Sequence, residues 1–124
     1  NGLMIERCGG RVSANAFRDL GRGALFALDS RGLAIDGNAV ERAGENGIMV
    51  WRSAKGDDGT IVRANRISEI RADAGGTGEY GNAIAVFRAG GVIVEGNLIR
   101  RAAYTAVRNN SGSNVTVANN NIAG

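Results

Sequence analysis

Four carboxylates in two polar segments are the residues with the clearest capacity for chemistry. The segments are 53–59 and 71–81, and the carboxylates are Asp57, Asp58, Asp73 and Glu79. A group of carboxylate oxygens can bind Ca²⁺, and a pair of carboxyl groups can hydrolyse a glycosidic bond. We therefore expect any catalytic residues to be among these four, with Ca²⁺ as the candidate cofactor and no metal-binding residue assigned. The alternative is that Asp57-Asp58-Gly59 forms an ordinary turn.

Aromatic and arginine side chains near the same segments could bind a sugar polymer. These candidates are Trp51, Arg52, Tyr80, Phe87, Arg88 and Arg108. An exposed Trp51 beside Phe87 would offer flat apolar area for stacking on a sugar ring at a small entropic cost. Guanidinium groups pair with carboxylates through two parallel hydrogen bonds, which favours a uronate-rich polysaccharide as the ligand. The alternatives are that a loop or another chain covers the rings and that nearby acids neutralise the arginines.

Composition excludes several other kinds of function. The 124 residues include no His and a single Cys, Cys8, so this chain has no His-based catalytic triad, no His-ligated zinc site and no internal disulfide. The net charge of +3 is small and its signs are interspersed, so we expect no nucleic-acid partner. No apolar run approaches the roughly 18 residues that span a bilayer, so we expect no membrane span. The glycine-rich segment 75–78 lacks the Lys and the helical pattern of a phosphate-binding loop.

An internal repeat shows which elements must position these residues. It reads apolar, x, apolar, x, x, Asn, x, apolar, as in LAIDGNAV (33–40) and VIVEGNLI (92–99). The repeated Asn residues are Asn15, Asn38, Asn65, Asn97 and Asn120, at intervals of 23, 27, 32 and 23 residues. A second motif of alternating apolar residues begins at Asn1, Asn46 and Asn82. Alternation over four or five positions predicts short strands rather than helices.

Three short strands in about 23 residues predict one turn of a triangular coil, and stacked coils form three parallel sheets with strands roughly 4.8 Å apart. The predicted interior rows are Leu3, Leu25, Ile48, Ile84 and Val107; Phe17, Val40, Ile67, Ile99 and Ile122; and Leu20, Ala43, Ile70 and Ala102. The recurrent Asn belongs at a bend, where its amide can bond the Asn of the next coil and where Asn tolerates the left-handed conformation. The absence of Pro fits, because each strand N–H is needed by a neighbouring coil.

A leucine-rich repeat is the main alternative, because its frame also places an Asn among alternating leucines. That repeat needs a further Leu three residues before the frame, where this chain has Ser30, Asp57, Ala89 and Gly112. Its second half is usually helical, whereas here that half is strand-like. A left-handed hexapeptide helix has a period of about 18 residues, which these intervals do not fit. The pattern therefore favours an all-β parallel β-helix.

The same residues resemble a known family. The frames IDGNAV (35–40) and VEGNLI (94–99), alternating with strands of the NGIMV type (46–50), resemble right-handed parallel β-helix proteins of the pectate-lyase-like superfamily. More narrowly, they are similar to an uncharacterised, Tat-exported bacterial repeat family of that fold. The resemblance extends over the whole chain and implies a right-handed solenoid of about five coils of three short strands, with an Asn stack at one bend. It also implies an exported protein, periplasmic or extracellular.

The two longer intervals place the segments 53–59 and 71–81 at opposite edges of one sheet. In relatives of this fold the substrate binds in a groove on that sheet between such loops, so the resemblance implies a polysaccharide ligand here. Enzymes of the superfamily act on acidic sugars with acidic residues, Ca²⁺ and in some cases an arginine base. An enzymatic activity would therefore be that of a polysaccharide lyase, an epimerase or a glycoside hydrolase. The alternative is a non-catalytic solenoid with a structural or adhesive role.

We expect residues 1–124 to form a single β-helix domain that is a segment of a longer solenoid. The repeat begins in mid-pattern at Asn1 and stops at Gly124. Open coil ends are strand edges, which template association with other strands. We therefore expect either end-to-end self-association or flanking coils beyond the segment.

Overall fold

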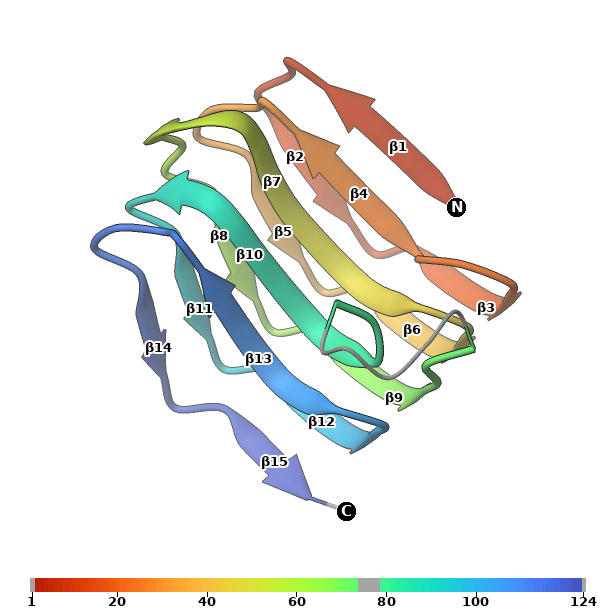
Figure 1. Ribbon diagram of the computed structural model, residues 1–124. Helices are drawn as coiled ribbons and strands as arrows, with labels where there is room; N and C mark the ends of the chain where they lie inside the picture. The colour runs from red at the N-terminus through yellow and green to blue at the C-terminus, as the bar shows by residue number, and fades with distance from the viewer. Residues whose placement is uncertain (1, 74–78, 124) are drawn as a thin grey trace.

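The computed structural model describes residues 2–73 and 79–123, which form fifteen strands in three parallel sheets (Figure 1). Each coil contributes one strand to each sheet in turn, so every sheet is five strands deep. The first coil (β1–β3) and the last (β13–β15) lie at opposite ends of the stack (Figure 1). Within the described ranges, no helix is long and apolar enough to cross a membrane.

The three sheets are named A, B and C in the order in which the chain visits them. Sheet A contains β1 (Leu3–Glu6), β4 (Leu25–Leu28), β7 (Asn46–Asp57), β10 (Asn82–Gly90) and β13 (Thr105–Asn110). Sheet B contains β2 (Arg11–Ser13), β5 (Ala34–Asp36), β8 (Ile61–Arg63), β11 (Ile93–Glu95) and β14 (Thr116–Ala118). Sheet C contains β3 (Ala16–Leu20), β6 (Ala39–Ala43), β9 (Arg66–Ile70), β12 (Leu98–Ala102) and β15 (Asn121–Ala123).

The strand register confirms the predicted interior rows. In sheet A the paired residues are Leu3, Leu25, Ile48, Ile84 and Val107. The two rows of sheet C, which begin at Phe17 and Leu20, also run as predicted. Ile48 and Ile84 in the central coils are 0% exposed, whereas Ile122 in the last coil is 54% exposed. The core is therefore a stack of thin layers, each covered by the coils on either side of it.

The Asn stack lies at the bend between sheets B and C. Its members are Asn15, Asn38, Asn65, Asn97 and Asn120. At each step the backbone N–H and the side-chain Nδ2 of one Asn donate to Oδ1 of the Asn in the next coil, at 2.9–3.1 Å. From Asn38 onward, Nδ2 also donates to a strand carbonyl of the preceding coil at 3.0–3.1 Å. The three central members are at most 1% exposed, so the ladder supplies the partners that water would otherwise provide.

The sequence pattern predicted that the Asn itself adopts the left-handed conformation at this bend. In the structure the residue before the Asn adopts it instead. Those residues are Ala14, Gly37, Ala64, Gly96 and Asn119, with φ between 53° and 65°. Each ladder Asn must aim both its backbone N–H and its side-chain amide along the stack, so the chain turns one residue earlier. The Asn is therefore required for its hydrogen bonds rather than for its tolerance of positive φ.

The segment 53–59, predicted as a loop, is mostly strand. β7 continues to Asp57 and keeps its pairing with β10 beyond a register shift, in which Trp51 pairs with Phe87 but Gly56 pairs with Ala89. Five steps along β7 thus match two steps along β10, which is a β-bulge. Pairing with β10 at Gly56 and Asp57 gives the end of this segment hydrogen-bond partners that an open loop would have to take from water.

The second predicted loop, 71–81, connects β9 to β10. Residues 71–73 and 79–81 lie outside the strands, at the entrance to β10. The glycine-rich segment 75–78, and Asn1 and Gly124 at which the repeat was expected to begin and stop, lie outside the described residues.

Candidate functional site

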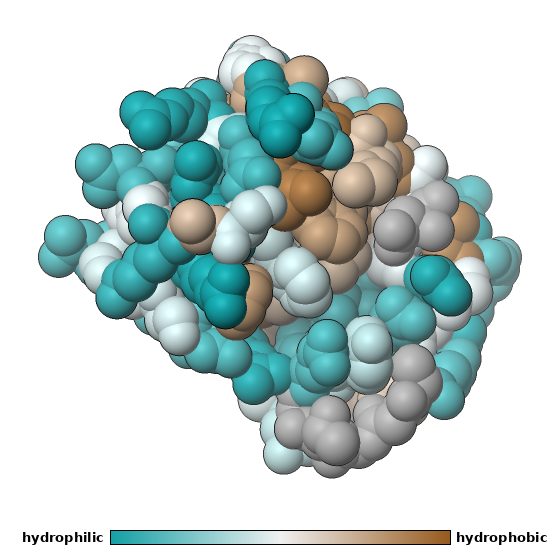
Figure 2. All heavy atoms as spheres, turned by 45° about the horizontal axis from the view of Figure 1, so that its top comes forward, coloured by the Kyte–Doolittle hydropathy of each residue, from teal (hydrophilic) through white to brown (hydrophobic). Residues whose placement is uncertain are grey.

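The outward face of sheet A carries an aromatic cluster that spans β4, β7 and β10. The Trp51 ring lies 5.0 Å from the Phe26 ring at an interplanar angle of 66°, and 5.3 Å from the Phe87 ring at 58°. Aromatic pairs prefer such tilted arrangements, each worth about 0.5–1.5 kcal/mol beyond the burial of area. Trp51 was predicted to be exposed, but it is partly buried because Phe26 and Phe87 flank it. Figure 2 shows hydrophobic side chains gathered in one region of the visible face, with hydrophilic side chains around them.

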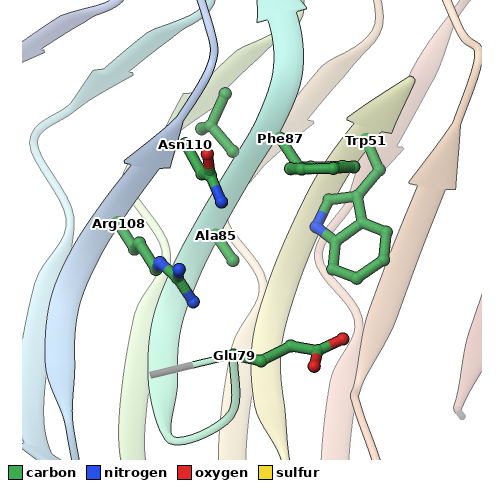
Figure 3. Close-up of a pocket in the computed structure, with 7 residues that line it drawn as sticks. Trp51, Glu79, Ala85, Phe87, Arg108 and Asn110 are labelled. Carbon is green, nitrogen blue, oxygen red and sulfur yellow. The ribbon is translucent and has the colours of Figure 1, made fainter. Parts of the chain in front are cut away.

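A cavity of about 310 Å³ opens beside this cluster (Figure 3). Its lining includes Trp51, Glu79, Ala85, Phe87, Arg108 and Asn110. The outward row changes from Met49 to Ala85 to Arg108 across β7, β10 and β13. Because Ala85 is small, it leaves space between its larger neighbours. Figure 3 shows the side chains of Trp51, Phe87, Asn110, Arg108 and Glu79 arranged around it. Stacking of the coils thus brings four residues predicted as site residues, from three strands and a turn, to one cavity.

Packing rather than polar bonding holds Trp51 in place. The indole Nε1 is buried and has no hydrogen-bond partner in the described part of the chain. Figure 3 shows the pyrrole ring of the indole turned toward Phe87 and Ala85. A buried N–H without a partner costs about 1–3 kcal/mol, so the contacts of the indole with its aromatic neighbours must offset that cost. A side chain held in this way presents a rigid apolar surface beside the cavity.

A second polar ladder, which the sequence analysis does not predict, holds the turn that carries Glu79. Asn46 and Asn82 both donate from Nδ2 to the Glu79 carbonyl, at 3.2 and 3.3 Å. The Asn82 N–H donates to Asn46 Oδ1 at 3.1 Å, and the Thr105 hydroxyl donates to Asn82 Oδ1. Both Asn side chains are buried, so these bonds fix the backbone at the entrance to β10. The sequence signal was an Asn at the same position of two neighbouring coils.

Arg52, predicted to bind substrate, is engaged at the corner between sheets A and B and does not line this cavity. Its Nη1 donates to the Ser30 carbonyl at 2.9 Å and lies 3.5 Å from Asp58 Oδ2. The Asp58 side chain is fully buried and accepts hydrogen bonds from the N–H and the hydroxyl of Thr60. A buried carboxylate needs such partners, because its desolvation costs several kcal/mol. Arg52 and Asp58 therefore stabilise the corner.

The structure does not bring the four predicted catalytic carboxylates together. Asp57 is the last residue of β7 and Asp58 follows it, whereas Asp73 and Glu79 precede β10. Strand β10 runs between these two edges of sheet A, from Asn82 to Gly90, which pairs with Asp57, and its eight steps correspond to about 26 Å of strand. Asp73 accepts a hydrogen bond from Arg71 Nε at 3.2 Å, and only Glu79 of the four lines the cavity. Within residues 2–73 and 79–123, no group of three His, Cys, Asp or Glu residues could hold a metal ion.

Comparison with known proteins agrees with the order of the parallel strands. A family model described as a right-handed β-helix region matches residues 1–124. The chain belongs to the right-handed β-helix family. No curated protein and no solved structure matched the chain. The β-helix fold is compatible with saccharide binding, with saccharide processing and with a structural role.

The remaining predicted residues of this β-helix border the cavity or lie away from it. Arg88 places its guanidinium carbon 4.6 Å from the centre of the Phe87 ring and donates to the Ser53 carbonyl at 2.8 Å. Tyr80 is partly buried in the turn before β10 and does not line the cavity. Asn110 does line it, although it was not predicted as a site residue. It pairs with Phe87 in the strand register, and that position was the available signal.

Proposed function

We propose that this β-helix binds an acidic polysaccharide on the outward face of sheet A, with the cavity beside Trp51 as the main subsite. The observation that supports this most directly is the meeting of an aromatic pair, a cation, a carboxylate and an amide around one cavity of about 310 Å³. Small-molecule sites typically combine an apolar lining with a few polar groups that fix the orientation of the ligand. A sugar ring has the matching chemistry, with an apolar face and hydroxyl groups around its edge.

Each lining side chain has a distinct role in this proposal. Trp51 and Phe87 contact the apolar face of the sugar, because flat rings offer area with few rotatable bonds. Arg108 donates to the carboxylate of a uronic acid. Glu79 accepts hydrogen bonds from hydroxyl groups, and Asn110 can both donate and accept. The β-sheet backbone beneath them holds all but Glu79, which the second polar ladder positions.

The placement of the carboxylates favours binding over processing. Hydrolysis of a glycosidic bond takes two carboxyl groups about 5–9.5 Å apart, on either side of the bond. Glu79 lines the cavity, but its predicted partners Asp57 and Asp58 lie at the other edge of sheet A and Asp73 is paired with Arg71. The proposed contacts use neither a nucleophile nor Ca²⁺.

A structural or adhesive solenoid is the second candidate. The continuous Asn ladder and the three complete sheets favour it, because both features make a rigid rod whatever its surface binds. Under this alternative, Trp51 serves only to pack the face of sheet A, and its replacement affects stability without affecting any glycan.

A glycan array tests the proposal with a matched pair of variants. Trp51→Ala removes the central ring, and Tyr104→Ala removes an aromatic side chain that is 54% exposed and does not line the cavity. We expect the original chain and Tyr104→Ala to bind acidic oligosaccharides, and Trp51→Ala to bind them at least tenfold more weakly. Circular dichroism confirms that each variant is folded. Equal binding by Trp51→Ala would contradict the proposal, and an array with no bound glycan would favour the structural alternative.

A further inference from the structure

A second cavity, of about 540 Å³, lies at the corner that follows sheet A in the first three coils. Its lining includes Arg7, Cys8, Asp29, Arg31, Arg52 and Ser53. The first two follow β1, the next two follow β4, and the last two belong to the bulged part of β7. Stacking of the coils brings these three pieces of chain together, and the Arg31 N–H donates to the Cys8 carbonyl at 3.4 Å. The bulge supplies the wall formed by β7.

The acidic residue of this cavity is already engaged. The two carboxylate oxygens of Asp29 accept from the N–H and the hydroxyl of Ser53, both at 2.7 Å. These hydrogen bonds, and to a smaller extent the charges of Arg52 and Arg7, lower the pKa of Asp29. Asp29 is therefore ionised at neutral pH, and its hydrogen bonds hold the bulge of β7 in place.

The three arginines of the cavity differ in how their charge is compensated. Arg7 pairs with Glu6 at 3.0 Å, and Arg52 lies 3.5 Å from the buried Asp58. By contrast, no residue in the described ranges forms a hydrogen bond or an ion pair with the Arg31 guanidinium. Arg31 is exposed, so its N–H donors remain accessible at the cavity. The uncompensated cation of this corner is Arg31.

We propose that the second cavity is a binding site for an oxyanion, either a carboxylate or a sulfate ester, with Arg31 as its main contact. A guanidinium group presents parallel donors that match the paired oxygens of both groups. Trp51 lines the first cavity and Arg52, the next residue, lines the second, so one polymer can contact both. Only the contact of one polymer with both cavities rests on the proposed function, because the oxyanion site is defined by its own residues.

Titration with simple anions at constant ionic strength tests the site without any saccharide. The probes are sulfate and acetate, and the signal is the backbone ¹H–¹⁵N resonances of Cys8 and Ser53, which line the cavity and are present in every variant. The matched control for Arg31→Gln is Arg63→Gln, which makes the same charge change at an exposed position of β8 that lines neither cavity. We expect saturable binding of at least one anion, weakened about fivefold by Arg31→Gln and unchanged by Arg63→Gln. The stronger of the two anions identifies the group that the site prefers.

Equal affinities in the two variants, or shifts that follow ionic strength without saturation, would overturn the proposal. Loss of saccharide binding through Trp51→Ala with intact anion binding would leave the oxyanion site standing, so the two proposals fail separately.

Cys8 provides a second test that needs no substitution, because it is the one Cys of the chain and its thiol is exposed. Iodoacetate and iodoacetamide both alkylate a thiolate, forming the S–C bond as iodide leaves and the thiol proton passes to solvent. Iodoacetate carries a carboxylate and iodoacetamide is neutral. We expect the rate of alkylation by iodoacetate, divided by the rate by iodoacetamide, to be at least threefold higher in the folded chain than in urea. We also expect sulfate to reduce this ratio. An equal or lower ratio in the folded chain would contradict an oxyanion site beside Cys8.

Discussion

Replacing Asn65 with Ala removes the centre of the Asn ladder, and the cost can be worked out bond by bond. Oδ1 of Asn65 accepts from the N–H and the Nδ2 of Asn38, at 2.9 and 3.0 Å. Its Nδ2 donates to the Ile35 carbonyl and to Asn97 Oδ1, both at 3.0 Å. The substitution therefore breaks four hydrogen bonds at a position that is 0% exposed. At about 1 kcal/mol net for each bond, we expect the free energy of unfolding to fall by about 4 kcal/mol.

Asn15→Ala is the matched control, because the same chemical change is made in the exposed first coil. The Asn15 side chain donates to the Ser13 carbonyl at 3.0 Å and to Asn38 Oδ1 at 3.1 Å. Water can replace these partners, so we expect a loss of about 1 kcal/mol. Urea denaturation followed by circular dichroism measures both free energies. Equal losses in the two variants, or a loss below about 2 kcal/mol for Asn65→Ala, would refute the reasoning that the buried ladder stabilises the stack.

Two further predictions concern single contacts. Ser53→Ala removes a hydrogen bond that lowers the pKa of Asp29, so that pKa rises toward its ordinary value in a ¹³C NMR titration. The stability that Asp29 contributes is present above its ordinary pKa and is lost as the pH falls through the lowered value. This loss in acid therefore becomes smaller in Ser53→Ala. An unchanged pKa of Asp29 would count against the assignment. Gly44→Ala would place a Cβ against the Gly21 carbonyl oxygen, and we expect it to lower the free energy of unfolding by about 1–3 kcal/mol. Gly21→Ala, whose Cβ meets nothing within 4 Å, should leave thermal unfolding unchanged, and similar effects of both substitutions would be inconsistent with the packing described.

The Asn ladder and the interior rows were predictable because stacked coils convert a repeat in sequence into a row in space. Asn38 bonds to Asn65 across 27 residues, and Asn65 bonds to Asn97 across 32. The frame of alternating apolar residues beside each Asn keeps the same local geometry, so extra residues elsewhere in the coil do not disturb it. The first cavity was predictable in part, since Trp51 and Phe87 share an outward row, whereas Asn110 was not predicted and Tyr80 does not line it.

The features that the sequence did not predict depend on backbone conformations and side-chain contacts that the repeat does not specify. Gly56 and its acidic neighbours are typical of a loop, yet pairing with β10 makes that segment a bulged strand. Arg52 reaches the buried Asp58 because that bulge ends at the corner, and no spacing rule indicates the pair. Ala14 and Ala64 adopt positive φ although Ala does not favour it, because hydrogen bonds of the ladder determine the bend.

Fluorescence titration tests the proposed saccharide-binding face most directly, because Trp51 is the one Trp of the chain and lines the first cavity. The ligand is an acidic oligosaccharide selected on the glycan array, and Tyr104→Ala serves as the control. We expect a saturable change in Trp51 emission, with the same midpoint in the original chain and in Tyr104→Ala. Calorimetric binding of the same oligosaccharide with no change in Trp51 emission would contradict a binding site on this face of sheet A.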